Sequence, residues 1–148
     1  MEIAMRYLEE KLQVKNIKGA GEVLLCCYIP DNPPEMNADR KRPAVLVLPG
    51  GGYQHVSPRE KEPVALEFLA AGMCAFTLTY SVEPEVVFPQ ALCEACLAVD
   101  YIRSHGEEFH IDPSNISVCG FSAGGHLAAT VGAFWNRDFV KDVIGEDK

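Results

Sequence analysis

The 148-residue sequence predicts an α/β protein with a doubly wound, mostly parallel sheet that follows an N-terminal β-hairpin. Three short runs are apolar at nearly every position, which is typical of strands buried on both faces of a parallel sheet. Segments with a helical spacing of apolar residues separate these runs, and such alternation favours right-handed crossovers. Glycine-rich turns directly follow two of the strands. We therefore expect one domain over residues 1–148, with its chemistry at the carboxyl edge of the sheet.

The N-terminal part of the chain is predicted to form the hairpin. Residues 12–17 and 22–29 have strand patterns and are joined around Gly19-Ala20-Gly21. Residues 30–43 are rich in proline, asparagine and charge, so we expect a surface loop there.

The middle of the chain predicts a strand, a helix and a second strand. Residues 44–48, Ala-Val-Leu-Val-Leu, form the first buried strand, and residues 73–78 form the second. Between them, Ser57 is predicted to be an N-cap, with Pro58 at the first helical position and Glu60 three residues after the cap. Gly72 is expected to end this helix.

A second crossover leads to the third buried strand. Helical spacing resumes at Phe88-Pro89 and continues to about His105. A turn is expected over residues 112–115, and residues 116–119 form the third strand. A further helix follows, so the expected order is hairpin, β, α, β, α, β, turn, α.

The charge of the chain argues against a polyanionic partner. The sequence holds 13 Lys and Arg against 21 Asp and Glu, a formal net charge of −8 at pH 7. Nucleic acid and anionic membrane surfaces reward clustered cations, so neither is an expected partner. No stretch approaches the roughly 18 apolar residues of a membrane span. The N-terminus has charges every few residues instead of the apolar core of a signal peptide, so we expect a cytoplasmic location.

The first glycine-rich turn, Pro49-Gly50-Gly51-Gly52-Tyr53, follows the strand 44–48. Glycines let the backbone approach a ligand closely and turn its N–H groups toward it, as an oxyanion hole requires. Taken alone, a flexible connection between strand and helix is the better interpretation. A phosphate-binding loop is disfavoured because the Lys-Ser/Thr ending is absent.

The second turn, Gly120-Phe121-Ser122-Ala123-Gly124, has the G-x-S-x-G pattern of a nucleophile elbow between a strand and a helix. Its serine must occupy a strained conformation, and a side chain two residues to either side would collide with the neighbouring strand or helix. The elbow would push the Ser122 hydroxyl out above the sheet. The N–H of Ala123, at the helix N-terminus, would point to where an oxyanion forms. A G-x-S-x-G motif together with an earlier triple glycine is much rarer than the motif alone.

These motifs resemble the α/β-hydrolases of the esterase and lipase type, nearest to the branch of acetyl-xylan esterases and bacterial carbohydrate esterases. The matching segments are RPAVLVLPGGGY, FPQALCEACLAVDYIRSH, IDPSNISVCGFSAGGHLAA and the helix between the first two. They cover most of residues 43–129. The resemblance implies that Ser122 is the nucleophile and that Gly51, Gly52 and Ala123 supply oxyanion N–H groups. Pro49 is a departure, since many relatives carry histidine before the triple glycine.

The resemblance also implies a catalytic acid and then a histidine, each on a loop beyond a later strand. An average helix takes about 11–12 residues, so only about one short element fits between the elbow helix and Lys148. We therefore expect a domain that is truncated relative to the family. His126, one turn into the elbow helix, is better explained by packing or capping than as the base. His55, on the first glycine turn, is a remote candidate.

A truncated sheet also predicts self-association. Without a later strand beside it, the strand 116–119 would be an unprotected apolar edge, which invites pairing with another chain. We therefore expect a homo-oligomer formed through this edge.

Three functions are compatible with these features. The first is a serine hydrolase of small carboxylic esters that deacetylates a sugar or xylan-like substrate through an acyl-enzyme on Ser122. The second is a non-catalytic half-domain that acts as a self-association or interaction module, and the third is a serine peptidase of the same fold. Loss of triad members lowers turnover by roughly 10⁴ to 10⁶, so this chain alone is expected to turn over poorly. No cofactor or metal is implied, because no His, Cys or Asp cluster has ligand spacing.

Overall fold

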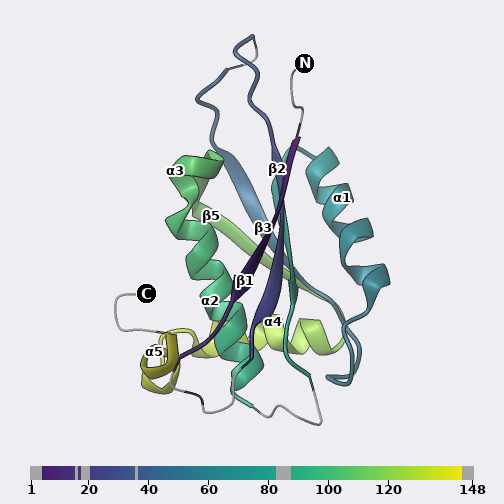
Figure 1. The fold of residues 1–148 in the computed structure, drawn as a ribbon, viewed down its shortest axis with the longest axis vertical. Helices are drawn as coiled ribbons and strands as arrows, with labels where there is room; N and C mark the ends of the chain where they lie inside the picture. The colour runs from purple at the N-terminus through teal and green to yellow at the C-terminus, as the bar shows by residue number, and fades with distance from the viewer. Residues whose placement is uncertain (1–4, 16, 18–20, 36, 83–87, 145–148) are drawn as a thin grey trace.

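The computed structural model describes residues 5–15, 17, 21–35, 37–82 and 88–144. Its centre is a five-stranded sheet in the order β1-β2-β4-β3-β5 (Figure 1). The strands are β1 (Met5–Leu12), β2 (Val23–Pro30), β3 (Arg42–Leu48), β4 (Cys74–Thr79) and β5 (Ile111–Gly120). The helices are the 3-10 helix η1 (Pro58–Glu60), α1 (Glu62–Ala70), α2 (Gln90–Ser104), α3 (Gly106–Phe109), α4 (Ala123–Phe134) and α5 (Asp138–Ile144).

The sheet is mixed. Strand β3 lies between β4 and β5 and runs parallel to both. Strand β2 pairs antiparallel with β1 on one side and with β4 on the other. The predicted α/β class with an N-terminal hairpin is confirmed, and the hairpin extends the parallel part of the sheet by two antiparallel strands.

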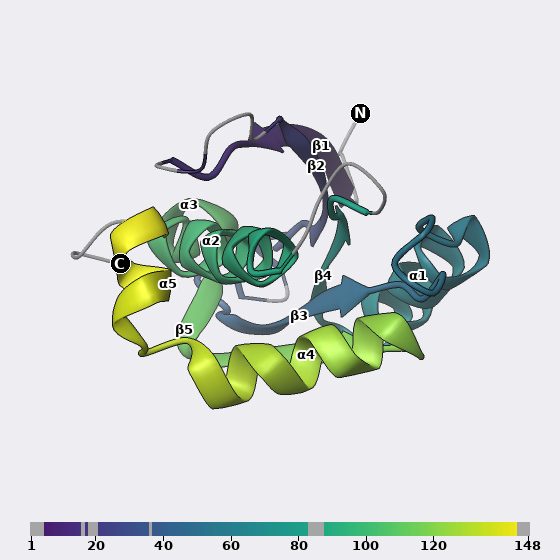
Figure 2. The ribbon, with the colours of Figure 1, turned by 90° about the horizontal axis from the view of Figure 1, so that it is seen from below.

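Helices cover both faces of the sheet. Helix α2 lies in the hollow of the curved sheet and α1 lies on its other side (Figure 2). Leu46 and Phe76 point into the core that α2 and α4 cover, whereas Val47 and Ala75 point into the smaller core beneath α1. All four side chains are fully buried. The central strands are therefore apolar at every position because both of their faces are covered.

The first strand of the hairpin lies earlier in the chain than the sequence analysis predicts. Strand β1 spans Met5–Leu12 and pairs with β2 along its whole length, so the predicted strand over residues 12–17 is wrong. Glu9 and Lys11 are exposed, while Leu8 and Leu12 pack against the core. The charges obscured this alternation, because an edge strand needs only one apolar face. Residues 19 and 20 of the predicted turn lie outside the described residues.

Strand β5 also begins earlier than predicted, at Ile111 instead of residue 116. Arg42 of β3 lies opposite Ile111, and Ala44 lies opposite Ile116, so two steps along β3 match five steps along β5. The predicted turn over residues 112–115 is therefore a bulge within the strand.

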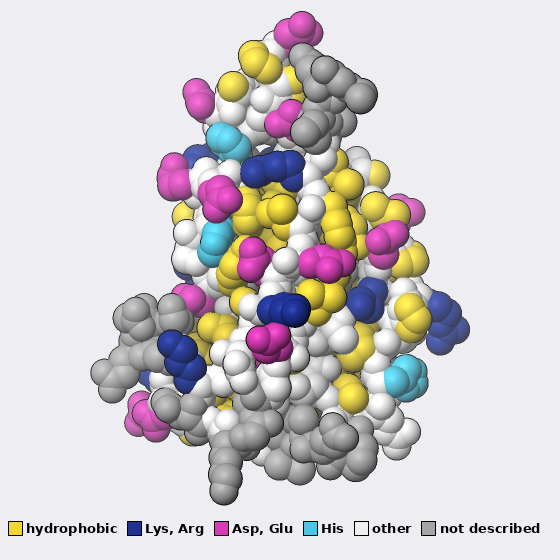
Figure 3. Space-filling view, viewed as in Figure 1, with side chains coloured by type: hydrophobic (Ala, Val, Ile, Leu, Met, Phe, Trp, Pro, Cys, Tyr) yellow, Lys and Arg dark blue, Asp and Glu magenta, His cyan; other side chains and the backbone are white. Residues whose placement is uncertain are grey.

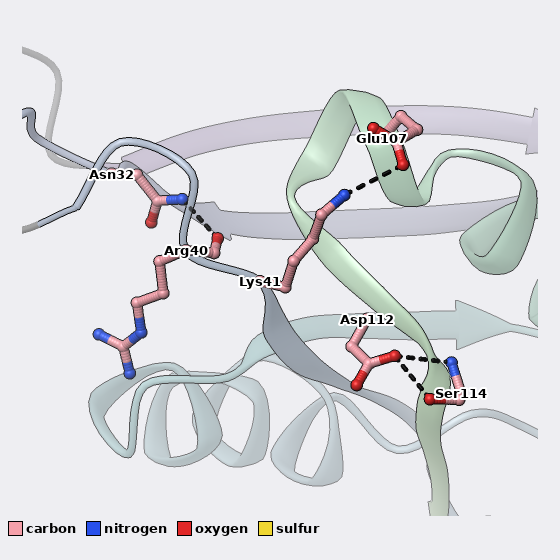
Figure 4. A network of polar contacts seen from close by, with 6 residues as sticks. All are labelled: Asn32, Arg40, Lys41, Glu107, Asp112 and Ser114. Atoms are coloured by element: carbon pink, nitrogen blue, oxygen red, sulfur yellow. Dashed lines mark hydrogen bonds and ion pairs between the residues drawn. The ribbon is translucent and has the colours of Figure 1, made fainter.

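Polar contacts hold the bulge (Figure 4). Asp112 Oδ1 accepts hydrogen bonds from the Ser114 backbone N–H at 3.0 Å and from the Ser114 hydroxyl at 2.6 Å. These bonds lower the pKa of the Asp112 carboxyl. Close by, Lys41 Nζ lies 3.1 Å from Glu107 Oε1. This network lies at the amino end of the parallel strands, so it is remote from both glycine turns.

The helix after the first glycine turn begins later than predicted. Residues 58–60 form η1, and α1 begins only at Glu62. The Ser57 side chain makes no capping bond, and its backbone N–H donates to Gly50 O at 2.9 Å. Ser57 therefore helps to close the glycine turn and does not cap α1. Helix α2, by contrast, matches the predicted helix closely.

On the face shown in Figure 3, lysine and arginine side chains are scattered among acidic ones and do not gather into a basic patch. None of the helices in the described ranges has the length and apolar character needed to cross a membrane.

Candidate active site

Both glycine turns lie at the carboxyl end of the parallel strands. The turn 49–53 follows β3, and the turn 120–124 joins β5 to α4. The two strands are neighbours, and the Phe121 N–H donates to Leu48 O at 3.2 Å. The prediction that the two motifs lie at the same edge of the sheet is confirmed.

Ser122 has the backbone conformation that a nucleophile elbow requires. Its φ is 54° and its ψ is −118°, a region that residues with a side chain rarely occupy. Such a conformation costs about 1–3 kcal/mol and persists only where the surrounding structure determines it. Ser122 is exposed and directly precedes Ala123, the first residue of α4. The hydroxyl therefore lies at the surface, at the amino end of a helix.

The glycines of the elbow are required by close backbone contacts. A Cβ on Gly120 would lie 2.1 Å from Gly124 O, within α4. A Cβ on Gly124 would lie 1.9 Å from Leu48 O and 2.5 Å from Pro49 O. Heavy atoms cannot approach this closely, so the predicted steric reason for the G-x-S-x-G pattern is confirmed.

Gly50 brings the first turn against the serine. A Cβ on Gly50 would lie 3.1 Å from Ser122 Cβ and 2.7 Å from Phe121 O. The absence of a side chain therefore lets the two turns touch through their backbones.

The first turn is tight. Three successive residues have positive φ: Gly51 at 144°, Gly52 at 66° and Tyr53 at 61°. The N–H groups of Gln54 and His55 both donate to Gly51 O, at 3.0 Å and 3.2 Å. These bonds turn the Gly51 carbonyl into the loop, so the chain reverses within a few residues.

Three backbone N–H groups of the two turns lack a hydrogen-bond acceptor within the described part of the protein. They are the N–H groups of Gly51, Gly52 and Ala123. The Ala123 N–H belongs to the first turn of α4, where the helix dipole favours negative charge. The role of these groups as oxyanion donors stays a prediction, and their geometry is compatible with it.

Side chains from other elements hold both ends of the first turn. Tyr80, which follows β4, donates its hydroxyl hydrogen bond to Pro49 O. At the other end, Tyr53 Oη lies 2.8 Å from His126 Nδ1 of α4. The Tyr53 ring also packs edge-on against the rings of Tyr80 and His126, with centroids 6.1 Å and 5.8 Å apart. Burial raises the pKa of Tyr53 and raises that of Tyr80 to about 12, so both hydroxyls stay protonated at neutral pH.

A buried carboxylate supports the segment after β4. Glu94 of α2 is fully buried and accepts hydrogen bonds from Ser81 N at 2.8 Å, Ser81 Oγ at 2.5 Å and Gln90 Nε2 at 3.2 Å. Burial raises the pKa of Glu94, although these bonds act in the opposite direction. Because Ser81 follows Tyr80, the cluster also fixes the segment from which Tyr80 reaches the first turn.

The sequence analysis missed both supporting groups. Tyr53 and His126 are 73 positions apart in the chain, so no local pattern joins them. The only signal for Glu94 was a carboxylate within a run of apolar and small residues on a predicted helix.

In the described residues, no histidine forms a hydrogen bond with the Ser122 hydroxyl. His126 bonds to a tyrosine of the first turn, which agrees with a packing role. His55 is exposed on that turn. The other two histidines, His105 and His110, flank α3 near the amino end of β5. No group of three or more His, Cys, Asp and Glu side chains that could hold a metal occurs in the described ranges.

The sheet, the elbow and the helices on both faces define an α/β-hydrolase fold. Residues 31–147 match the model of the BD-FAE family, and the chain belongs to this family.

Proteins similar to this chain include esterases and an enzyme of xylan breakdown. The chain is 38% identical over 109 residues to endo-1,4-beta-xylanase B of Butyrivibrio fibrisolvens, and 26% identical over 118 residues to an acetylxylan esterase of Xylanibacter ruminicola. These matches cover 72% and 78% of this chain.

Among solved structures, an α/β hydrolase called MGS-M1 from a Medee basin deep-sea metagenome library is 46% identical, with a TM-score of 0.75 over 86% of this chain. The carboxylesterase Cest-2923 of Lactobacillus plantarum is 28% identical, with a TM-score of 0.81 over 93% of this chain.

This chain spans only part of each of these proteins. It covers 17% and 23% of the two curated relatives and 51% and 50% of the two solved chains. The activity of a whole relative is therefore a proposal for this chain.

Proposed function

We propose that Ser122 is the nucleophile of a carboxylic ester hydrolase. The observation that carries this proposal is the strained backbone of Ser122, at φ 54° and ψ −118°, on a turn whose flanking glycines cannot be replaced without a backbone collision. Strain of this kind concentrates at functional sites. The strained turn presents the Ser122 hydroxyl at the amino end of α4, beside the turn 49–53, whose Gly51 and Gly52 N–H groups have no protein acceptor among the described residues.

The chemistry would proceed by acyl transfer. The Ser122 hydroxyl oxygen attacks the ester carbonyl carbon while its proton passes to a base, for which the family resemblance implies a histidine on a further segment. The negative charge that develops on the carbonyl oxygen is stabilised by N–H groups of Gly51, Gly52 and Ala123. The alcohol leaves with a proton, and water then releases the acid from Ser122.

For the substrate, we propose a small ester, in particular an acetyl group on a sugar. Support comes from the similarity to an acetylxylan esterase and to a carboxylesterase. Nothing in the geometry of the two turns favours an amide over an ester, so a comparison of ester and amide substrates is needed to test the peptidase alternative.

The proposal is tested by the intact mass of the chain before and after incubation with a fluorophosphonate. We expect one adduct on the natural sequence, no adduct on Ser122→Ala, and one adduct on Ser104→Ala, which removes an exposed serine at the end of α2. A folded natural chain without an adduct would contradict the assignment for this chain alone, and an adduct that survives in Ser122→Ala would contradict it outright. Release of nitrophenol from p-nitrophenyl acetate, without release of nitroaniline from p-nitroacetanilide, would favour the esterase over the peptidase.

A second candidate function, self-association through β5, rests on a different observation. In the described residues β5 pairs only with β3, so its other edge is unpaired, and Ser117 within the strand is exposed. An unpaired strand edge is a template for pairing with another chain. Sedimentation of the natural chain should show a dimer or larger species that Ser117→Lys shifts toward the monomer, and a monomeric natural chain at high concentration would exclude this function.

A further inference from the structure

We propose that Tyr53 and His126 form a positioning clamp, which holds the Gly51–Gly52 turn at a fixed distance from Ser122 and Ala123. The consequence for catalysis rests on the proposed function, whereas the clamp itself is a property of the fold and is tested separately.

The Gly51–Gly52 part of the turn needs an external anchor. Gly52 has open space around the position of a Cβ, so no side-chain contact of its own restrains it. Glycine loses more conformational freedom on folding than any other residue, so fixing it is costly. The hydrogen bonds within the turn join it to its own continuation, as from His55 N to Gly51 O, and its backbone contact with the elbow is at Gly50, ahead of the two glycines.

Tyr53 supplies this anchor at a strained backbone position. Its φ of 61° is rare for a residue with a large side chain. The side chain is held on two sides, by the edge-on contact with Tyr80 and by the 2.8 Å hydrogen bond to His126. A strained backbone whose side chain is fixed in this way defines the path of the two glycines directly before it.

His126 connects this anchor to the segment that carries Ser122. The backbone N–H of His126 donates to Ser122 O at 3.0 Å, a hydrogen bond between residues four apart at the start of α4. His126 is therefore one helical turn from Ser122 in a rigid element. The clamp thus joins the two segments that carry the candidate donor N–H groups, one on the Gly51–Gly52 turn and one at Ala123.

The connection between Tyr53 and His126 matters for an oxyanion hole, whose N–H donors come from two separate segments. Donors from two separate segments stabilise a developing charge only if their spacing is set before the reaction. Supporting groups that fix such donors to within about 0.5 Å are needed for full effect. His126 therefore acts as a positioning residue through its Nδ1, and this nitrogen is engaged by Tyr53 instead of by the Ser122 hydroxyl.

The first test measures amide hydrogen exchange in the full chain. The probes are the Gln54, His55 and Ser57 amides, which are bonded to carbonyl groups of the turn. Tyr53→Phe removes the hydrogen bond and keeps the ring, and His126→Phe removes the bond and keeps an aromatic side chain at this position. We expect each variant to speed exchange of these amides about threefold to tenfold, as the loss of one hydrogen bond predicts.

The double variant should exchange no faster than either single variant, because both remove the same bond. His126→Asn, which can place a side-chain oxygen near the position of Nδ1, should restore slow exchange in part. His105→Phe is the matched control, since His105 also contacts a tyrosine ring, that of Tyr101, but at the far end of α2. Unchanged exchange in both single variants, or additive effects in the double variant, would overturn the clamp.

The second test measures the catalytic consequence as the rate of fluorophosphonate labelling. We expect Tyr53→Phe to lower the maximal labelling rate about threefold to tenfold, with little change in the concentration that gives half of that rate. A labelling rate equal to that of the natural chain, with faster amide exchange, would retain the clamp and reject its role in the reaction. A natural chain that does not label at all would reject the proposed function for this chain alone, and the exchange experiment would still decide the clamp.

Discussion

The two glycine turns of this protein use glycine for partly different reasons. In the turn 120–124, Gly120 and Gly124 are excluded from carrying a side chain by backbone atoms 2.1 Å and 1.9 Å away. In the turn 49–53, Gly52 faces open space, and only its φ of 66° favours glycine. Steric contact thus requires glycines in both turns, including Gly50 and Gly51 of the turn 49–53, whereas Gly52 is required by its backbone conformation alone.

This difference explains how each turn is held in place. The elbow is wedged between β3 and α4, so its own backbone supports the strain at Ser122. The turn 49–53 depends on side chains from elsewhere, with Tyr80 at its start and His126 at its end. A site built from both turns thus combines a rigidly held Ser122 with a neighbouring loop whose position also depends on two side-chain contacts.

The largest effect is expected from a side chain in the wedge. Gly124→Ala places a Cβ 1.9 Å from Leu48 O, so β3 and α4 must separate. We expect the free energy of unfolding to fall by about 4 kcal/mol or more, as for other severe core collisions. Urea unfolding monitored by circular dichroism measures this change.

Gly132 provides the matched control in the same helix. A Cβ on Gly132 meets nothing within 4 Å. Gly132→Ala should therefore raise the stability of the chain by about 0.5–1 kcal/mol through helix propensity. If Gly124→Ala were as mild as this control, the steric account of the elbow would be wrong.

A smaller effect is expected in the turn 49–53. Gly52→Ala meets no neighbouring atom and costs only the strain of the left-handed conformation. We expect a loss of about 1–2 kcal/mol. Gly21→Ala, which also has open space but no positive φ, should be neutral or slightly stabilising in the same urea titration. Equal losses at both positions would show that φ does not distinguish them.

The smallest effect is expected at the nucleophile position, and its sign is reversed. Ser122→Gly removes the side chain from a strained conformation, so we expect a gain of about 1 kcal/mol. Ser122→Ala keeps a Cβ and should bring no comparable gain. A loss of stability in Ser122→Gly, measured by thermal and urea unfolding, would mean that the elbow stores no strain at this residue.

Much of the fold could be predicted because its signals are local. The runs at residues 44–48 and 73–78 are apolar throughout, and they form the central strands β3 and β4. The elbow was also predictable, because a strand, two glycines, a serine and a helix follow one another without a gap. The edge strand β1 was misplaced because its charged face obscured the alternation with Leu8 and Leu12.

By itself, the amino-acid sequence determined the α/β class, the edge of the sheet at which the two motifs meet, and the glycines that the elbow cannot do without. Only the tertiary structure decided what supports the site: the bond between Tyr53 and His126 and the burial of Glu94 beside Ser81. The physical reason is the distance along the chain over which each effect acts. Apolar periodicity and turn chemistry act between near neighbours in the chain, whereas these contacts join residues that become neighbours only after the sheet has formed.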